Sequence, residues 1–141
     1  MKVSEVMSRE VELVSPQDSV QDAARRMKDG DVGALPVGDA DKLIGMITDR
    51  DIAVRVVAEG RGIDTPVSDA MTSDVVAVRE DDDVQDAADQ MADAQVRRLP
   101  VVGGDGQLVG IISLADIART GESAAEEALE MISEAGGEHN Q

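Results

Sequence analysis

The 141-residue sequence contains no phenylalanine, tyrosine, tryptophan or cysteine. The absence of cysteine excludes disulfides, a thiolate nucleophile and cysteine-based metal sites. Without aromatic residues, the core must be built from Val, Ile, Leu, Met and Ala, and apolar residues make up 42% of the chain. No apolar run approaches the roughly 20 residues that a membrane-spanning helix needs, and acidic residues interrupt the N-terminal apolar pattern, unlike in a signal peptide. We therefore expect a cytoplasmic protein with one compact domain or two interdependent halves.

Basic residues are scarce. The chain has 13 Lys plus Arg against 30 Asp plus Glu, which gives a net charge of −17. A surface this negative repels nucleic acid and anionic membranes, so neither is expected as a partner. Lysine occurs only at Lys2, Lys28 and Lys42, and Asp outnumbers Glu. This bias is typical of proteins from high-salt cytoplasms, and an ordinary acidic mesophilic protein is the alternative.

The sequence repeats itself. The segment VSEVM at residues 3–7 returns as VSDAM at 67–71, and VQDAA at 20–24 returns at 84–88, both at an offset of 64. Self-similarity at a fixed offset indicates a duplicated supersecondary unit. The predicted parts are repeat 1, a linker and repeat 2, at residues 1–60, 61–66 and 67–121.

Each copy is predicted to fold as β-α-β-β-α, which gives an α/β (α+β) protein. Apolar residues at i, i+3, i+4 and i+7 form one face of the first helix. That face consists of Val20, Ala23, Ala24 and Met27, and in the second copy of Val84, Ala87, Ala88 and Met91. The predicted strands are residues 11–14, 33–37 and 43–47, then 75–78, 97–102 and 108–112. Since neither copy can bury its sheet alone, the two are expected to pack face to face about a pseudo-twofold axis.

Prolines and acidic clusters receive structural explanations. Pro36 and Pro100 predict that the first strand of each hairpin is short or at an edge. The triplet Asp81–Asp83 complements the dipole of the helix that follows it. Asp39 and Asp41 do not continue into a calcium-binding loop. No metal site is therefore predicted.

The most informative motif occurs twice, as GMITDRD at residues 45–51 and GIISLAD at 110–116. Each runs from the end of a strand into a helix, with a hydroxyl and a carboxylate three residues apart. Such a pair resembles a capping box, which satisfies free N–H groups of the first helical turn. The same helix start is also an anion site, and its Asp can accept hydrogen bonds from the vicinal hydroxyls of a ribose. The motif is therefore consistent both with helix capping and with binding of a nucleoside phosphate.

These motifs together resemble a tandem pair of cystathionine-β-synthase (CBS) domains, often called a Bateman module. The resemblance covers roughly residues 1–120 and rests on VSEVM/VSDAM, VGALPV/VRRLPVV and GMITDRD/GIISLAD. The GALP…TDRD pattern is similar to that of small stand-alone modules of the hypoxic-response type. The family implies two pockets between the repeats, commonly for AMP, ADP, ATP or S-adenosylmethionine. It also implies a homodimer in which two modules meet through their helices in a flat disc.

The resemblance assigns the site residues. One pocket would contain Thr48 and Asp51 and the other Ser113 and Asp116, each Asp holding a ribose. The second-strand segments of both repeats would line the central cleft and place Gly33 and Ala34 opposite Arg97 and Arg98. The remaining lining residues are Ile47 and Ile112, the walls Met71 and Val76 toward Asp51, and the walls Met7 and Val11 toward Asp116.

Two departures from the family pattern affect the ligand. Gly33 stands where some nucleotide-binding members carry a basic residue, which leaves Arg97 and Arg98 as the clustered cations for phosphate. AMP or ADP is therefore expected to bind better than ATP, because each added phosphate brings more negative charge into an acidic protein. Glu12, which matches Val76, puts a charge at the wall of the Asp116 pocket, so the Asp51 pocket is expected to bind more tightly.

The last part of the sequence predicts no catalytic site. The only histidine, His139, lies in the tail 136–141, which is expected to be disordered, and no phosphate-loop, zinc-protease or nucleophile-elbow motif occurs. Residues 122–135 predict an additional helix that packs on its own module or binds an effector protein. Its apolar stripe consists of Ala125, Ala128, Leu129, Ile132 and Ala135.

The leading prediction is a non-catalytic sensor that binds an adenine nucleotide and requires no cofactor. The alternative is a ligand-free structural or interaction module, in which both hydroxyl–Asp junctions are only helix caps.

Overall fold

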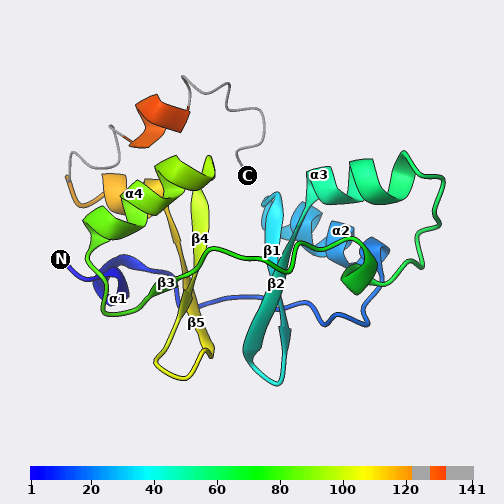
Figure 1. Cartoon of the computed structure of the whole chain (residues 1–141), viewed down its shortest axis with the longest axis horizontal. Coiled ribbons are helices and arrows are strands. Elements are labelled where there is room, and N and C mark those ends of the chain that lie inside the picture. The colour runs from blue at the N-terminus through cyan, green and yellow to red at the C-terminus, as the bar shows by residue number, and fades with distance from the viewer. Residues whose placement is uncertain (122–127, 133–141) are drawn as a thin grey trace. The chain divides into compact units, whose positions relative to one another are not determined.

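The computed structural model describes residues 1–121 and 128–132. Their helices and strands divide into two compact units. The middle unit is Glu12–Val75, and the terminal unit combines Met1–Val11 with the chain from Val76 onward. Figure 1 shows the elements of each unit, which mix helices with small sheets and confirm the α+β class.

The long helices follow the predicted apolar period. Helix α2 (Val20–Gly30) begins after Ser19, whose hydroxyl accepts a hydrogen bond from the backbone N–H of Asp22. Helix α4 (Val84–Ala94) begins after Asp83 in the same way. The predicted faces are buried with one exception: Ala24 is exposed, whereas its counterpart Ala88 is buried. Each face therefore anchors its helix to the core of its own unit.

Each unit is built around a β-hairpin. In the middle unit, β1 (Ala34–Asp39) pairs antiparallel with β2 (Lys42–Thr48). In the terminal unit, β4 (Arg98–Val102) pairs antiparallel with β5 (Leu108–Ser113) and parallel with the short β3 (Val78–Arg79). The predicted order β-α-β-β-α therefore holds in the terminal unit.

The predicted first strands are shorter than the sequence pattern suggested. The predicted strand 75–78 is replaced by β3, which starts at Val78. The predicted strand 11–14 is wrong, because only Val14 pairs, in a single parallel bridge to Val37. A run of apolar residues predicts burial. A strand also needs a partner strand that pairs with several consecutive residues, and here only Val14 pairs, with Val37.

Pro36 lies in β1, an edge strand of a two-stranded sheet, in line with the edge position predicted for it, whereas Pro100 lies in β4, the five-residue middle strand of the other sheet. Pro36 stands opposite Met46, whose N–H and C=O bond instead to Thr72 at 3.0 and 2.9 Å. Pro100 stands opposite Ile111, which exchanges bonds of the same kind with Ser8. Proline, which has no N–H, is tolerated at these positions because the residue opposite it in the hairpin does not accept a hydrogen bond from it.

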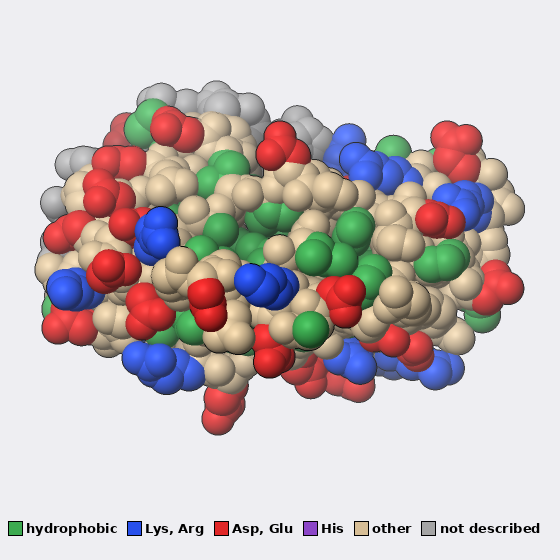
Figure 2. All heavy atoms as spheres, turned by 60° about the horizontal axis from the view of Figure 1, so that its bottom comes forward, with side chains coloured by type: hydrophobic (Ala, Val, Ile, Leu, Met, Phe, Trp, Pro, Cys, Tyr) green, Lys and Arg blue, Asp and Glu red, His purple; other side chains and the backbone are tan. Residues whose placement is uncertain are grey.

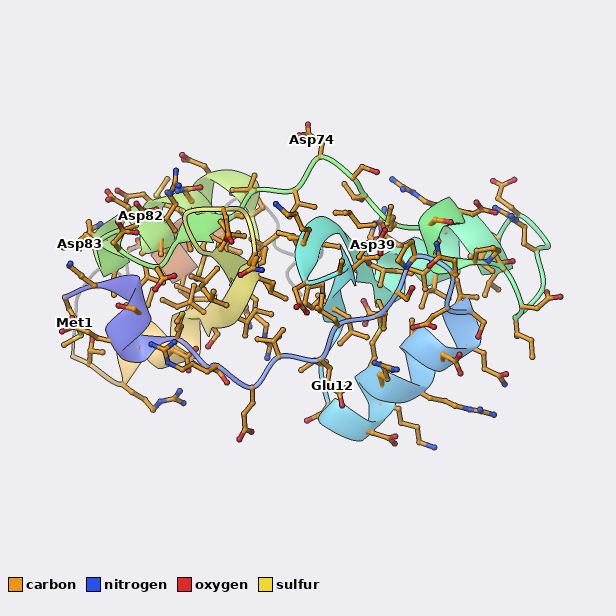
Figure 3. All side chains as sticks on the ribbon, turned by 90° about the horizontal axis from the view of Figure 1, so that it is seen from below. Met1, Glu12, Asp39, Asp74, Asp82 and Asp83 are labelled. Atoms are coloured by element: carbon orange, nitrogen blue, oxygen red, sulfur yellow. The ribbon has the colours of Figure 1, made fainter. Side chains whose placement is uncertain are left out.

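The first residues of each repeat pack in the unit that contains the rest of the other repeat. Helix α1 (Val3–Val6) is tied to the start of α4 by a bond of 2.8 Å from the Val3 N–H to the Asp82 carbonyl. The 3-10 helix η2 (Val67–Asp69) is tied to the start of α2 by a bond of 2.8 Å from the Val67 N–H to the Asp18 carbonyl. Figure 3 shows Met1 beside Asp82 and Asp83, where α1 meets α4. The repeats predicted at 1–60 and 67–121 thus exchange their first residues.

The short helices follow the hairpins. Helix α3 (Asp49–Ile52) continues directly into a π-helix, η1 (Ala53–Val57), and α5 (Leu114–Ala118) follows β5.

Of the predicted C-terminal helix, the structure describes residues 128–132, which are helical. Ala128 and Ile132 are buried in the core of the terminal unit, while Leu129 is exposed. Ala125, Ala135 and the tail 136–141 lie outside the described residues.

The surface carries many acidic side chains. Figure 2 shows red side chains outnumbering blue ones on the face in view. Ion pairs join Arg61 to Asp69, Arg119 to Asp116, and the N-terminal amine to Asp83. No helix in the described parts of the chain is long and apolar enough to cross a membrane.

The turn between β1 and β2 supports a stability prediction. Ala40 and Asp41 have φ of 51° and 68°, values that a two-residue hairpin turn requires and that Asn and Gly adopt more easily than Ala. We expect Ala40→Asn to raise the free energy of unfolding by about 0.5–1 kcal/mol, and Ala40→Val to lower it. Urea titration followed by circular dichroism measures both, and an Asn variant no more stable than the Val variant would contradict the assignment of strain to Ala40.

Candidate functional site: two strand-to-helix junctions

Both predicted capping boxes are present. At the end of β2, the Thr48 hydroxyl accepts a hydrogen bond from the Asp51 N–H, and the Thr48 N–H donates to Oδ2 of Asp51, both at 3.0 Å. At the end of β5, Ser113 and Asp116 form the same pair at 3.1 and 2.9 Å. Each Asp therefore uses one carboxylate oxygen to hold its own helix start.

The second carboxylate oxygen distinguishes the two junctions. Oδ1 of Asp116 bonds to the guanidinium of Arg119, one turn further along the chain. No residue in the described part of the chain bonds to Oδ1 of Asp51. Asp51 thus keeps an acceptor available for a ligand, while Asp116 has both oxygens engaged.

Gly33 and the first residue of β1, Ala34, lie at the Asp51 junction. The carbonyl of Gly33 accepts a hydrogen bond of 2.9 Å from the N–H of Asp49, the first residue of α3. Ala34 pairs with Thr48 across the hairpin. Gly33 and Ala34 therefore adjoin the capping box, and their role as lining residues of a ligand site stays a prediction.

Arg97 and the first residue of β4, Arg98, lie at the Asp116 junction in the same way. The carbonyl of Arg97 accepts a hydrogen bond of 2.9 Å from the N–H of Leu114, and Arg98 pairs with Ser113. Arg97 is exposed and Arg98 is half-buried. The backbone of both arginines thus adjoins the junction in the terminal unit, and their predicted position opposite Gly33 and Ala34 stays a prediction.

Two predicted lining residues are core residues. Ile47 is fully buried in the core of the middle unit, and Ile112 is fully buried in that of the terminal unit. Each lies one residue before the hydroxyl of its junction. They support the junction from inside and do not present a surface to a ligand.

The glycine that opens each motif is explained by close approach. A Cβ on Gly45 would lie 2.9 Å from Sδ of Met71, and one on Gly110 would lie 2.7 Å from Sδ of Met7. In both cases the carbonyl oxygen of the residue after the methionine is equally close, at 2.8 and 2.7 Å. The exchanged segment therefore passes directly over the hairpin, where only glycine leaves room.

The residues predicted as apolar walls divide between the two units. Met71 belongs to the unit of Asp51, and Met7 and Val11 belong to the unit of Asp116. Val76 begins the second part of the terminal unit and is 44% exposed. Its place beside Asp51 stays a prediction.

Two arginines near the junctions were not among the predicted site residues. The spacing of Arg119 from Asp116, three residues along a helix, is a sequence signal for an ion pair. Arg55 carries no comparable signal, because its partners Ala70 and Met71 are distant in sequence. In the described part of the chain, no group of three or more His, Asp or Glu side chains could hold a metal ion.

Comparisons with known proteins extend the resemblance over both repeats. The family described as CBS domain matches residues 3–58 and again 67–123. CBS domain-containing protein YhcV of Bacillus subtilis is 45% identical over 116 residues, which are 82% of each chain. Hypoxic response protein 1 of Mycobacterium tuberculosis is 38% identical over 117 residues, covering 82% of this chain and 81% of that protein.

Two similar solved structures contain ligands. CBSX2 in complex with AMP is 29% identical, with a TM-score of 0.75 over 85% of this chain and 95% of that one. The CBS domain pair of the protein MJ0100, in complex with 5′-methylthioadenosine and S-adenosyl-L-methionine, is 27% identical, with a TM-score of 0.74 over 85% and 94% of the two chains.

Proposed function

This chain belongs to the CBS domain family, and we propose that it is a non-catalytic regulatory module that binds an adenine nucleotide, AMP or ADP, at its hydroxyl–Asp junctions. The module responds by changing its shape or its partner. It acts as a homodimer in the cytoplasm, and an effector protein binds it in a way that depends on whether the nucleotide is bound.

The observation that carries this proposal is the Asp51 junction. Its capping box fixes the carboxylate at the start of a helix, and the second oxygen has no partner in the described part of the chain. A fixed carboxylate with a free acceptor suits the hydroxyls of a ribose, and charge-assisted hydrogen bonds of this kind are the stronger ones. The complexes of CBSX2 and MJ0100 support an adenosine compound as the ligand.

Isothermal titration with AMP, ADP, ATP and S-adenosylmethionine tests the proposal. We expect AMP and ADP to bind, and AMP to bind more tightly than magnesium-free ATP at low salt. Since the chain has no aromatic residue, an absorbance band at 260 nm in purified protein, after nucleic acid is excluded, would indicate carried-over nucleotide. Four silent titrations would contradict the proposal.

The second candidate is a ligand-free structural or interaction module. It is favoured by the closure of both capping boxes through the protein's own groups. In that case the hydroxyl and carboxylate stabilise each helix by about 1 kcal/mol and do nothing else. Ligand dependence separates the two candidates.

Arg119 supports a prediction about the weaker junction. Its side chain is 72% exposed, and exposed ion pairs contribute little, typically 0.2–1 kcal/mol. A ribose at Asp116 has to displace it. In a background of Asp51→Ala, we therefore expect Arg119→Ala to raise the affinity for AMP about two- to fivefold in calorimetric titration.

The matched control is Arg79→Ala, which removes an exposed arginine of the same unit whose guanidinium bonds to the Gly104 carbonyl. It should leave AMP affinity unchanged. Weaker binding by the Arg119→Ala variant would contradict the competition and would indicate that Arg119 contacts phosphate.

A further inference from the structure

Arg55 links the helix of the Asp51 junction to the exchanged segment. It lies in η1, the π-helix that continues α3. Its Nη1 donates to the carbonyls of Ala70 and Met71 at 3.2 and 3.0 Å. Carbonyls at the end of a short helix lack partners within it, so a cation there is favourable. One guanidinium therefore caps the end of η2 from the helix that begins at Asp49.

The capped segment is attached to the hairpin as well. The Met71 N–H bonds back to the Val67 carbonyl at 2.9 Å, and Thr72 exchanges two hydrogen bonds with Met46. The close approach to Gly45 leaves this segment little freedom to shift over β2. A displacement of α3 and η1 would thus pull on the segment through Arg55 and be resisted by the hairpin.

The π-helical geometry of η1 affects the direction in which Arg55 points. The Ala58 N–H bonds to the Ala53 carbonyl at 2.9 Å, and the Arg61 N–H bonds to the Val56 carbonyl at the same distance. Both bonds span five residues, so the turn is wider than an α-helical one. Widening changes the direction of the side chains that follow Asp51, and Arg55 is the one that reaches the segment.

The second repeat differs at the matching position. An offset of 65 aligns Gly45 with Gly110, Asp51 with Asp116, and Arg55 with Thr120. The Thr120 hydroxyl donates to the Ile117 carbonyl of its own helix at 2.6 Å. The fold therefore accepts threonine here, and the connection through Arg55 is a property of the first repeat.

We propose that Arg55 is a positioning residue of the Asp51 junction, which couples nucleotide binding at Asp51 to the exchanged segment Val67–Thr72. A nucleotide that fixes the first turn of α3 also fixes η1. Arg55 then holds Ala70 and Met71, and with them the chain that leads into the second repeat. This inference rests on the proposed nucleotide binding and names the route by which the rest of the protein senses it.

Amide hydrogen exchange with and without AMP tests the coupling in the full chain. In the wild-type protein, we expect AMP to slow exchange of the Met46, Met71 and Thr72 amides by about tenfold, in line with the local opening of hydrogen-bonded segments. In the Arg55→Thr variant, AMP should still bind, about three- to tenfold more weakly, and the slowing at these three amides should be lost. Arg55→Lys, which keeps the charge, should restore part of it.

The control is Arg61→Thr. Arg61 also contacts η2, through an exposed ion pair of 2.7 Å with Asp69, but it lies outside α3 and η1. Loss of this pair loosens the segment and should leave the AMP response in place. Equal slowing in wild-type protein and the Arg55→Thr variant, with AMP bound to both, would overturn the coupling alone. A wild-type protein that binds no adenine nucleotide would overturn the proposed function and the coupling with it.

Discussion

Replacement of Asp51 by alanine is expected to lower the affinity for AMP at the middle-unit junction at least about tenfold, because it removes two charge-assisted hydrogen bonds to the ribose. Folding should lose only about 1 kcal/mol, the contribution of one helix cap. The reason for the separation is structural: one carboxylate oxygen closes the capping box, and the other has no bonded partner in the described part of the chain. Calorimetric titration and thermal melts measure the two effects independently.

The matched variant is Asp116→Ala. It should cost the same cap energy, about 1 kcal/mol, and a smaller loss of AMP binding, because Arg119 already occupies its second oxygen. The predicted charge of Glu12 at that pocket acts in the same direction. Unchanged binding in both variants would reduce the two motifs to helix caps, and a larger loss at Asp116 would reverse the assignment of the stronger site.

Replacement of Val3 by alanine is expected to destabilise the terminal unit by about 2 kcal/mol, although Val3 is only the third residue of the sequence. Its side chain is fully buried in a core that it shares with α4 and β4. Truncation there leaves a cavity in the packing of the second repeat. Native-state hydrogen exchange should therefore show faster exchange in residues 84–117 and little change in residues 20–48.

Val67→Ala provides the reciprocal control. Val67 occupies the position in VSDAM that Val3 occupies in VSEVM, and it is fully buried in the core of the middle unit. Its truncation should accelerate exchange in residues 20–48 instead. Faster exchange in residues 20–48 for Val3→Ala, and in residues 84–117 for Val67→Ala, would contradict the exchange of segments between the repeats.

The sequence by itself determined the features that depend on neighbours within one or two helical turns. The repeat, the apolar faces of α2 and α4 apart from the exposed Ala24, and the capping boxes at Thr48 and Ser113 were predicted correctly. Propensity, periodicity and capping act over three or four residues, so a single sequence contains all the information that they need. The burial of Ile47 and Ile112 agrees with their alternation along the strand with the half-buried Thr48 and Ser113.

The tertiary structure decided what depends on partners distant in the chain. VSEVM and VSDAM share Val, Ser and Met at matching positions, so local pattern cannot say which repeat each one covers, and the structure pairs each with the other repeat. The presence of Pro36 and Pro100 within paired strands is also explained by that pairing, since the exchanged segments take up the hydrogen bonds of the residues opposite them. The contact of Arg55 with Ala70 and Met71 has the same origin. Long-range packing selects among equivalent local patterns by the total surface that it buries and the hydrogen bonds that it completes, and neither quantity exists until the chain is folded.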